Sequence, residues 1–160
     1  MERILEEIER CQDNNCKFAA ISLALMIPDV CAAFDKKGES YGKDYIKWCN
    51  DWITWPEIAG EVVYALRCSL FHSLDGDLDK QVKYKEFLEK QKDEKEHFYR
   101  FFFPHEDTEE PVIYQKTSDN KIQNTICISL LTNGIVQAYK NFAKANPDFS
   151  HEYINLWLEG

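Results

Sequence analysis

An arginine and a histidine, Arg67 and His72, stand near the middle of this chain with four residues between them. Arginine stays charged at all ordinary pH values, and its planar guanidinium group can hold two phosphate oxygens at once. Histidine takes up or releases a proton near neutral pH, so it can act as a general acid or base. The two residue types therefore suit chemistry at a phosphate group, and that chemistry needs no metal ion.

Residues 57 to 74 are predicted to form the helix that carries both side chains. At 100° per residue, Arg67 and His72 lie about 140° apart, at the two margins of one side of this helix. The opposite side is predicted to face the core and collects Ile58, Ala59, Val62, Val63, Leu66, Leu70 and Leu74. The side bounded by Arg67 and His72 collects Gly60, Glu61, Tyr64, Ala65, Cys68 and Phe71.

The composition of this second side indicates an interface, because it is not filled with Lys and Glu as a solvated face is. Tyr64 and Phe71 would supply contact area, and the small residues would let another backbone approach. A two-fold dimer is the commonest arrangement of this kind, and it would bring Arg67 and His72 of both chains into one groove. The alternative is that this side packs against the terminal helices of its own chain.

The segment from Arg67 to His72 resembles the motif of the HEPN class, in which an Arg is followed after four to six residues by a His late in a helix. The preceding residues are also similar, with an apolar helix (20–34), a Trp-bearing segment (41–52) and the lead-in Tyr64-Ala65-Leu66. The similarity covers about residues 15 to 75. For the remaining residues, only the helical pattern is similar.

The resemblance implies a metal-independent endoribonuclease of a toxin–antitoxin or phage-defence system, acting as a homodimer without cofactor. It implies Arg67 and His72 as catalytic residues and Tyr64, Cys68 and Phe71 as substrate-binding residues. The implied partners are RNA and a protein antitoxin.

One departure counts against catalysis, because Cys68 stands where catalytic members usually carry a polar residue after the Arg. A non-catalytic module that binds nucleotide, RNA or a protein is therefore the alternative function. A purely structural alternative pairs Arg67 with Glu61 or Asp75 and lets His72 cap the end of the helix.

Composition limits the other classes of function. The chain has 160 residues and a net charge of -9, so it fits a single domain and repels polyanions on average. Any nucleic acid must therefore bind at a local basic pocket or alongside a basic partner. No uninterrupted run of 18 apolar residues occurs and the first residues are charged, which predicts a cytoplasmic protein without a membrane span.

Metal sites are not expected from the sequence. The six cysteines form no C-x-x-C pair and are interpreted as small buried hydrophobic residues. Residues 75 to 86 partly match a calcium loop, but Lys80 occupies the position that needs glycine. His97 and His105 have no acidic or cysteine partner at ligand spacing.

The expected fold class is all-α, a HEPN-like antiparallel bundle of four to five helices with a small β-hairpin inserted. A charged segment that forms either a solvated helix or a loop, followed by the hairpin, should occupy residues 76 to 121, with strands on either side of residues 104 to 111. A break at residues 13 to 15 and a kink at Pro28 are expected in the first helix. Helices are predicted over residues 2–34, 42–52, 56–75, 122–145 and 150–158.

Overall fold

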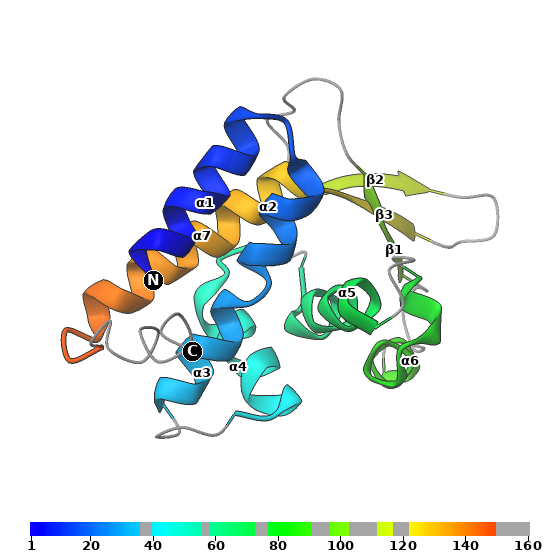
Figure 1. Ribbon diagram of the computed structural model, residues 1–160. Helices are drawn as coiled ribbons and strands as arrows, with labels where there is room; N and C mark the ends of the chain where they lie inside the picture. The colour runs from blue at the N-terminus through cyan, green and yellow to red at the C-terminus, as the bar shows by residue number, and fades with distance from the viewer. Residues whose placement is uncertain are drawn as a thin grey trace.

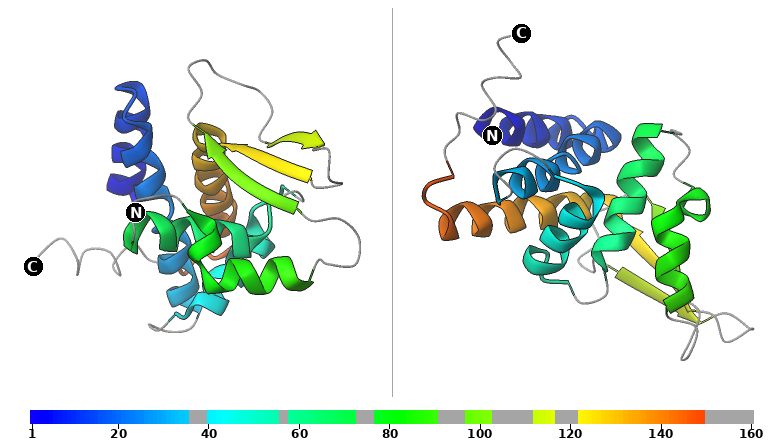
Figure 2. Two further views of the ribbon diagram at one scale, coloured as in Figure 1. Left: turned by 90° about the vertical axis from the view of Figure 1, so that its right-hand side faces the viewer. Right: turned by 90° about the horizontal axis from the view of Figure 1, so that it is seen from below.

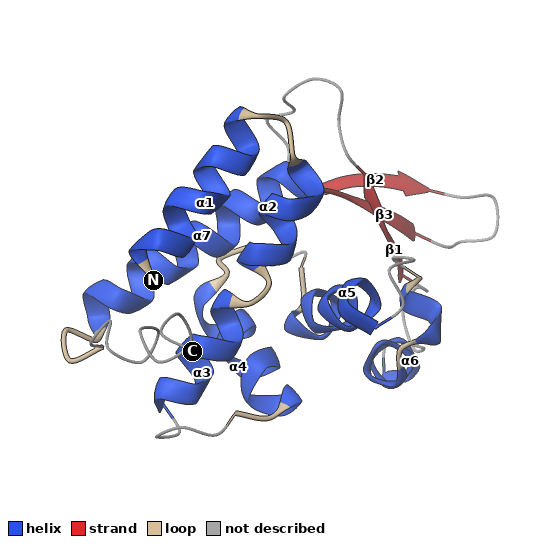
Figure 3. Ribbon diagram, viewed as in Figure 1, coloured by secondary structure: helices blue, strands red, loops and turns tan. Residues whose placement is uncertain are grey.

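The computed structural model shows a largely helical protein with one small sheet (Figure 1, Figure 3). It describes residues 1–35, 40–55, 58–72, 77–90, 97–102, 112–116 and 122–149. The helices are α1 (Glu2–Asp13), α2 (Lys17–Ala24), α3 (Ile27–Asp35), α4 (Gly42–Trp52), α5 (Gly60–His72), α6 (Val82–Lys90) and α7 (Ile128–Ala145), with a short 3₁₀ helix at Leu78–Lys80. The strands are β1 (His97–Phe102), β2 (Val112–Lys116) and β3 (Ile122–Cys127).

The N-terminal region forms three helices where the sequence predicted one broken helix. The break between α1 and α2 lies at the predicted place, and Asn15 there adopts a left-handed backbone conformation with φ of 57°. A second break separates α2 from α3, so that Pro28 falls in the first turn of α3, where its missing N–H costs nothing. The described residues thus contain seven α-helices, and the predicted number of four to five was too small.

Helix α7 packs against α2 and α3, and its buried residues belong to the hydrophobic core (Figures 1 and 2). Phe142 contacts Trp48 and Trp52 of α4 edge-on, with ring centres 6.0 and 5.3 Å apart. Edge-to-face pairs of this kind add to the stabilisation from area burial. They fix α4 against α7 and so place the helix on which α5 packs.

The sheet differs from the predicted hairpin in its pairing. β1 and β2 are strands as predicted, but they do not pair with each other, because β3 lies between them. β1 runs parallel to β3 and β2 runs antiparallel to it. The predicted hairpin turn at residues 104 to 111 lies outside the described residues.

β3 also corrects the predicted helix at residues 122 to 145. The helix begins at Ile128, and residues 122 to 127 form the central strand. Asn124 and Ile126 of this strand are buried, while Thr125 between them is half-buried. β-Branched residues fit a pleated surface well, and both edges of the strand are paired, so the tertiary pairing outweighs the helical pattern. The predicted helix at 150–158 lies outside the described residues.

The charged segment forms helix α6, which is solvated on one side and attached to the sheet by Tyr84. The backbone N–H of Tyr99 in β1 donates to the phenol oxygen of Tyr84 at 3.0 Å. Phe87 is buried beside the same strand, with its ring 6.1 Å from that of Tyr99. α6 therefore covers the free edge of β1 at this position, which protects an edge strand from pairing with other chains.

Stability at alkaline pH should depend on Tyr84. Burial raises the pKa of Tyr84 from 10.0 to about 12, so the folded state holds the phenol proton to a higher pH than the unfolded state does. This contribution is complete below pH 10 and is lost as the pH rises from 10 to 12, by about 2–3 kcal/mol in total. Urea unfolding between pH 9 and 11.5 should show wild type losing stability faster than Tyr84→Phe. Parallel curves for the two proteins would contradict this assignment.

The segment Lys17–Phe34 is the one described stretch with the length and hydropathy of a membrane span, with a mean hydropathy of 1.7. In the fold it is divided between α2 and α3, and 44% of it is buried inside the protein. Core helices of soluble proteins have the same properties, so the segment is weak evidence for a membrane location.

Candidate functional site

Helix α5 is held in place by its first residue. The backbone N–H of Gly60 donates to the side-chain oxygen Oδ1 of Asn50 in α4 at 2.7 Å, which satisfies a group that the helix itself leaves unpaired. A Cβ at position 60 would lie 2.4 Å from the backbone oxygen of Ile46, so only glycine allows this approach. The two helices therefore meet backbone to backbone at the start of α5.

The side of α5 that was predicted to form an interface is partly buried inside the chain. Gly60, Ala65 and Cys68 are buried, so that α5 is covered on more than its predicted core side. The predicted packing on terminal helices is replaced at Gly60 by packing on α4. Phe71 and His72 stay exposed at the C-terminal end of α5.

Arg67 is bound by a carboxylate from another helix. Its Nε donates to Oδ2 of Asp29 in α3 at 2.7 Å, with the two side chains 26% and 33% exposed. The structural alternative predicted Glu61 or Asp75 as the partner of Arg67. Glu61 is not the partner, and Asp75 lies outside the described residues. Asp29 is 38 positions away in the sequence, and no local pattern marks it.

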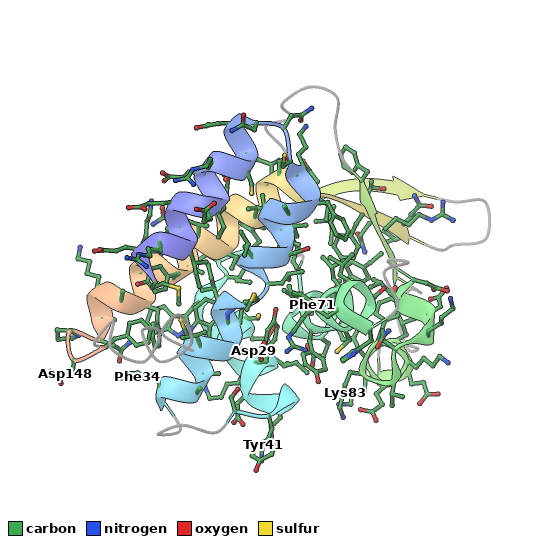
Figure 4. The ribbon with its side chains drawn as sticks, viewed as in Figure 1. Asp29, Phe34, Tyr41, Phe71, Lys83 and Asp148 are labelled. Atoms are coloured by element: carbon green, nitrogen blue, oxygen red, sulfur yellow. The ribbon has the colours of Figure 1, made fainter. Side chains whose placement is uncertain are left out.

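Two aromatic rings flank the guanidinium group of Arg67. Its central carbon lies 5.7 Å from the ring centre of Tyr45 and 5.8 Å from that of Phe71. Cation–π attraction at such distances holds the group in place. Figure 4 labels Asp29 on α3 and Phe71 on α5, and Arg67 contacts both residues.

Tyr45 contacts the guanidinium group of Arg67, and Tyr64 packs against Tyr45. Tyr45 is fully buried, and its hydroxyl donates to the backbone oxygen of Leu25 at 3.1 Å. The ring of Tyr64 meets that of Tyr45 at 5.4 Å and is only half-buried. Cys68, one helical turn further along α5, is buried. Burial, and after it the neighbouring Cys68 thiol, raises the pKa of Tyr64.

Burial sets the ionisation of the groups in this cluster. Desolvation raises the pKa of Tyr64 and raises those of Tyr45 and Cys49 well above their ordinary values, so all three keep their protons at neutral pH. Desolvation also raises the pKa of Asp29, although the nearby charge of Arg67 lowers it in part. For Arg67, burial opposes the charge, but Asp29 outweighs it and the net pKa is raised. Arg67 is thus permanently cationic.

The guanidinium group keeps donor capacity for an anion. Within the described part of the chain its one ion pair is made through Nε, and neither Nη group has a hydrogen-bond partner there. Guanidinium N–H donors match phosphate oxygens in geometry. The Nη groups of Arg67 can therefore bind a phosphate near the C-terminal end of α5. Nearby, Phe71 is 44% exposed and His72 is the last residue of α5.

The effect of Arg67 on the pKa of Asp29 can be measured directly. In Arg67→Leu, the pKa of Asp29 should rise further, because the attraction that lowers it is lost while the desolvation that raises it remains. Carboxyl carbon NMR titration would measure this. The carboxyl of Glu86, whose pKa is lowered by Lys83, is the internal control and should not move. An Asp29 titration that is the same in both proteins would refute the pairing.

Comparison with known proteins does not identify a family. No protein-family model matches the chain, and neither the curated proteins nor the solved structures contain a significant match. The described residues also contain no group of three or more His, Cys, Asp or Glu side chains arranged to hold a metal ion.

Proposed function

We propose that this protein is a homodimeric, metal-independent endoribonuclease of the HEPN class, with Arg67 and His72 of both chains forming one site. The observation that carries the proposal is the position of Arg67, which is fixed through Nε by Asp29 with both Nη groups free of described partners, five residues before the exposed His72 that ends α5. The HEPN-like bundle and its cytoplasmic role in defence or toxin–antitoxin pairing belong to the same proposal.

The reaction is cleavage by the 2′-hydroxyl of RNA. Its oxygen attacks the adjacent phosphorus, the bond from phosphorus to the 5′-oxygen breaks, and a 2′,3′-cyclic phosphate and a 5′-hydroxyl form. His72 takes the proton from the attacking hydroxyl or gives one to the leaving oxygen. Arg67 stabilises the charge that develops on the phosphate oxygens. The half-buried Tyr64 provides a face on which an unpaired base can stack.

The exposed surface around the Arg67–Asp29 pair suits a second copy of the chain. Phe71 stacks on one side of Arg67, and Met26 lies three residues before Asp29, one helical turn away. These two apolar side chains are 44% and 43% exposed. A two-fold contact over them would cover this apolar surface and bring the two arginines and two histidines together.

The decisive test is RNA cleavage by purified protein in EDTA. Wild type should produce fragments with cyclic phosphate ends, whereas Arg67→Ala and His72→Ala should not. Absence of cleavage by wild type across single-stranded and structured RNAs would overturn the proposed activity.

A charge placed in the proposed dimer contact should separate the chains. Phe71→Glu buries a carboxylate in the contact and should convert the dimer to monomer, with loss of cleavage, when measured by light scattering after gel filtration. Val82→Glu is the matched control, because Val82 is 67% exposed on α6 and is not one of the residues that the proposed contact uses. A monomeric wild type would contradict the composite site.

The second candidate is a non-catalytic HEPN-like module that binds nucleotide, RNA or a protein partner through the same surface. The observation that favours it is Asp29, whose charge offsets that of Arg67 and weakens its attraction for phosphate. The net charge of -9 acts in the same direction. RNA binding without cleavage in the EDTA assay would support this candidate.

A further inference from the structure

Gly134, in the middle of α7, allows the ring of Trp55 to contact the helix backbone. A Cβ at Gly134 would lie 2.6 to 2.9 Å from three carbon atoms of the Trp55 ring. Glycine inside a helix is destabilising relative to alanine, by about 0.5–1 kcal/mol. The glycine at position 134 therefore leaves room for the indole of Trp55 against α7.

A cavity of about 290 Å³ lies between this tryptophan and the end of α4. This volume is close to the lower end of small-molecule sites, which begin at roughly 300 Å³. Trp52 lines another part of the cavity and is held edge-on against Phe142, with ring planes at 87°. Two partly exposed indoles therefore border one space.

Apart from Thr54, the polar side chains that line the cavity are carboxamides. Asn133, Gln137 and Asn141 follow at intervals of four along α7, so they form one stripe on the helix. Gln137 donates to Oδ1 of Asn141 at 3.1 Å, and Asn133 accepts from Gln12 at 2.9 Å. The oxygen of Gln137 and the nitrogen of Asn141 then remain as an acceptor and a donor with no partner among the described residues.

We infer that this cavity binds a neutral nucleobase, stacked on the indoles and bonded through its edge to Gln137 and Asn141. No charged residue is found among the described residues that line the cavity, which suits an uncharged ring system. Carboxamides present a donor and an acceptor side by side, as the edge of adenine requires. Aromatic side chains stack on the face of any base. The cavity shares no residue with the Arg67 cluster, so this inference stands independently of the proposed cleavage.

Calorimetric titration with adenosine tests the inference. Wild type should bind adenosine, Gln137→Ala should weaken binding about tenfold through loss of an edge contact, and Trp55→Leu should weaken it further. Lys140→Ala is the matched control on α7, exposed and outside the cavity lining, and should bind as wild type does. Circular dichroism checks the fold of each variant. If Trp55→Leu does not fold, the exposed Gln137 still decides the result.

A single-stranded oligoadenylate distinguishes the two sources of the base. Tighter binding of the oligomer than of adenosine would identify an RNA strand as the ligand, and equal binding would identify a free nucleoside. Methyl glucoside serves as the competing chemistry, because sugars also stack on tryptophan. Absence of adenosine binding, equal binding by Gln137→Ala, or binding of the glucoside alone would overturn the inference.

Discussion

Replacement of His72 with alanine should reduce RNA cleavage by about 10²–10⁴-fold and leave the midpoint of thermal unfolding unchanged. The loss follows from removal of the group that moves the proton in the proposed reaction. The fold should not respond, because His72 is exposed at the end of α5, and exposed substitutions usually change stability by less than about 0.5 kcal/mol. Initial rates in EDTA and a thermal melt provide the two measurements.

The matched control for His72→Ala is Lys90→Ala, since Lys90 is also an exposed basic residue that ends a helix. It should retain the wild-type rate and melting temperature. If His72→Ala cleaves RNA as fast as wild type does, His72 is not the acid or base, and the binding module becomes the better account of Arg67.

Gly60→Ala should lower the free energy of unfolding by about 1–3 kcal/mol. The new Cβ would lie 2.4 Å from a backbone oxygen of α4, so one of the two helices must move. The melting temperature should fall by roughly 2–12 °C for a chain of this size. Because α5 carries Arg67 and His72, its displacement should also reduce cleavage.

Gly42→Ala separates this backbone effect from ordinary crowding. A Cβ at Gly42 would approach the phenol end of Tyr64 at 2.6 Å, but a half-buried side chain can move aside more easily than a helix backbone can. Its melting temperature should therefore stay near that of wild type. Equal destabilisation by both substitutions would show that crowding the backbone at Gly60 costs no more stability than crowding a side chain at Gly42.

Several helices could be predicted from the sequence because their signals are local. The apolar stripe of α4 gave its bounds as residues 42–52, and Tyr45, Trp48 and Cys49 of that stripe are buried as expected. The break before α2 follows from Asn15, since asparagine tolerates a left-handed conformation. The aromatic and β-branched runs predicted strands β1 and β2, because the signal for each strand depends only on the residue types within that run.

Strand pairing and the environment of Arg67 depended on residues far apart in the chain. The sequence placed Arg67 and His72 on one helix, but it did not indicate that Asp29 of α3 binds Arg67 or that Tyr45 of α4 supports it. Residues 122–127 have a pattern that fits a helix, and they form a strand because β1 and β2 pair with both their edges. Such contacts depend on how separate elements pack, and periodicity within one element carries no information about them. The sequence by itself therefore determined the candidate residues, whereas the tertiary structure decided which groups set their charge and exposure.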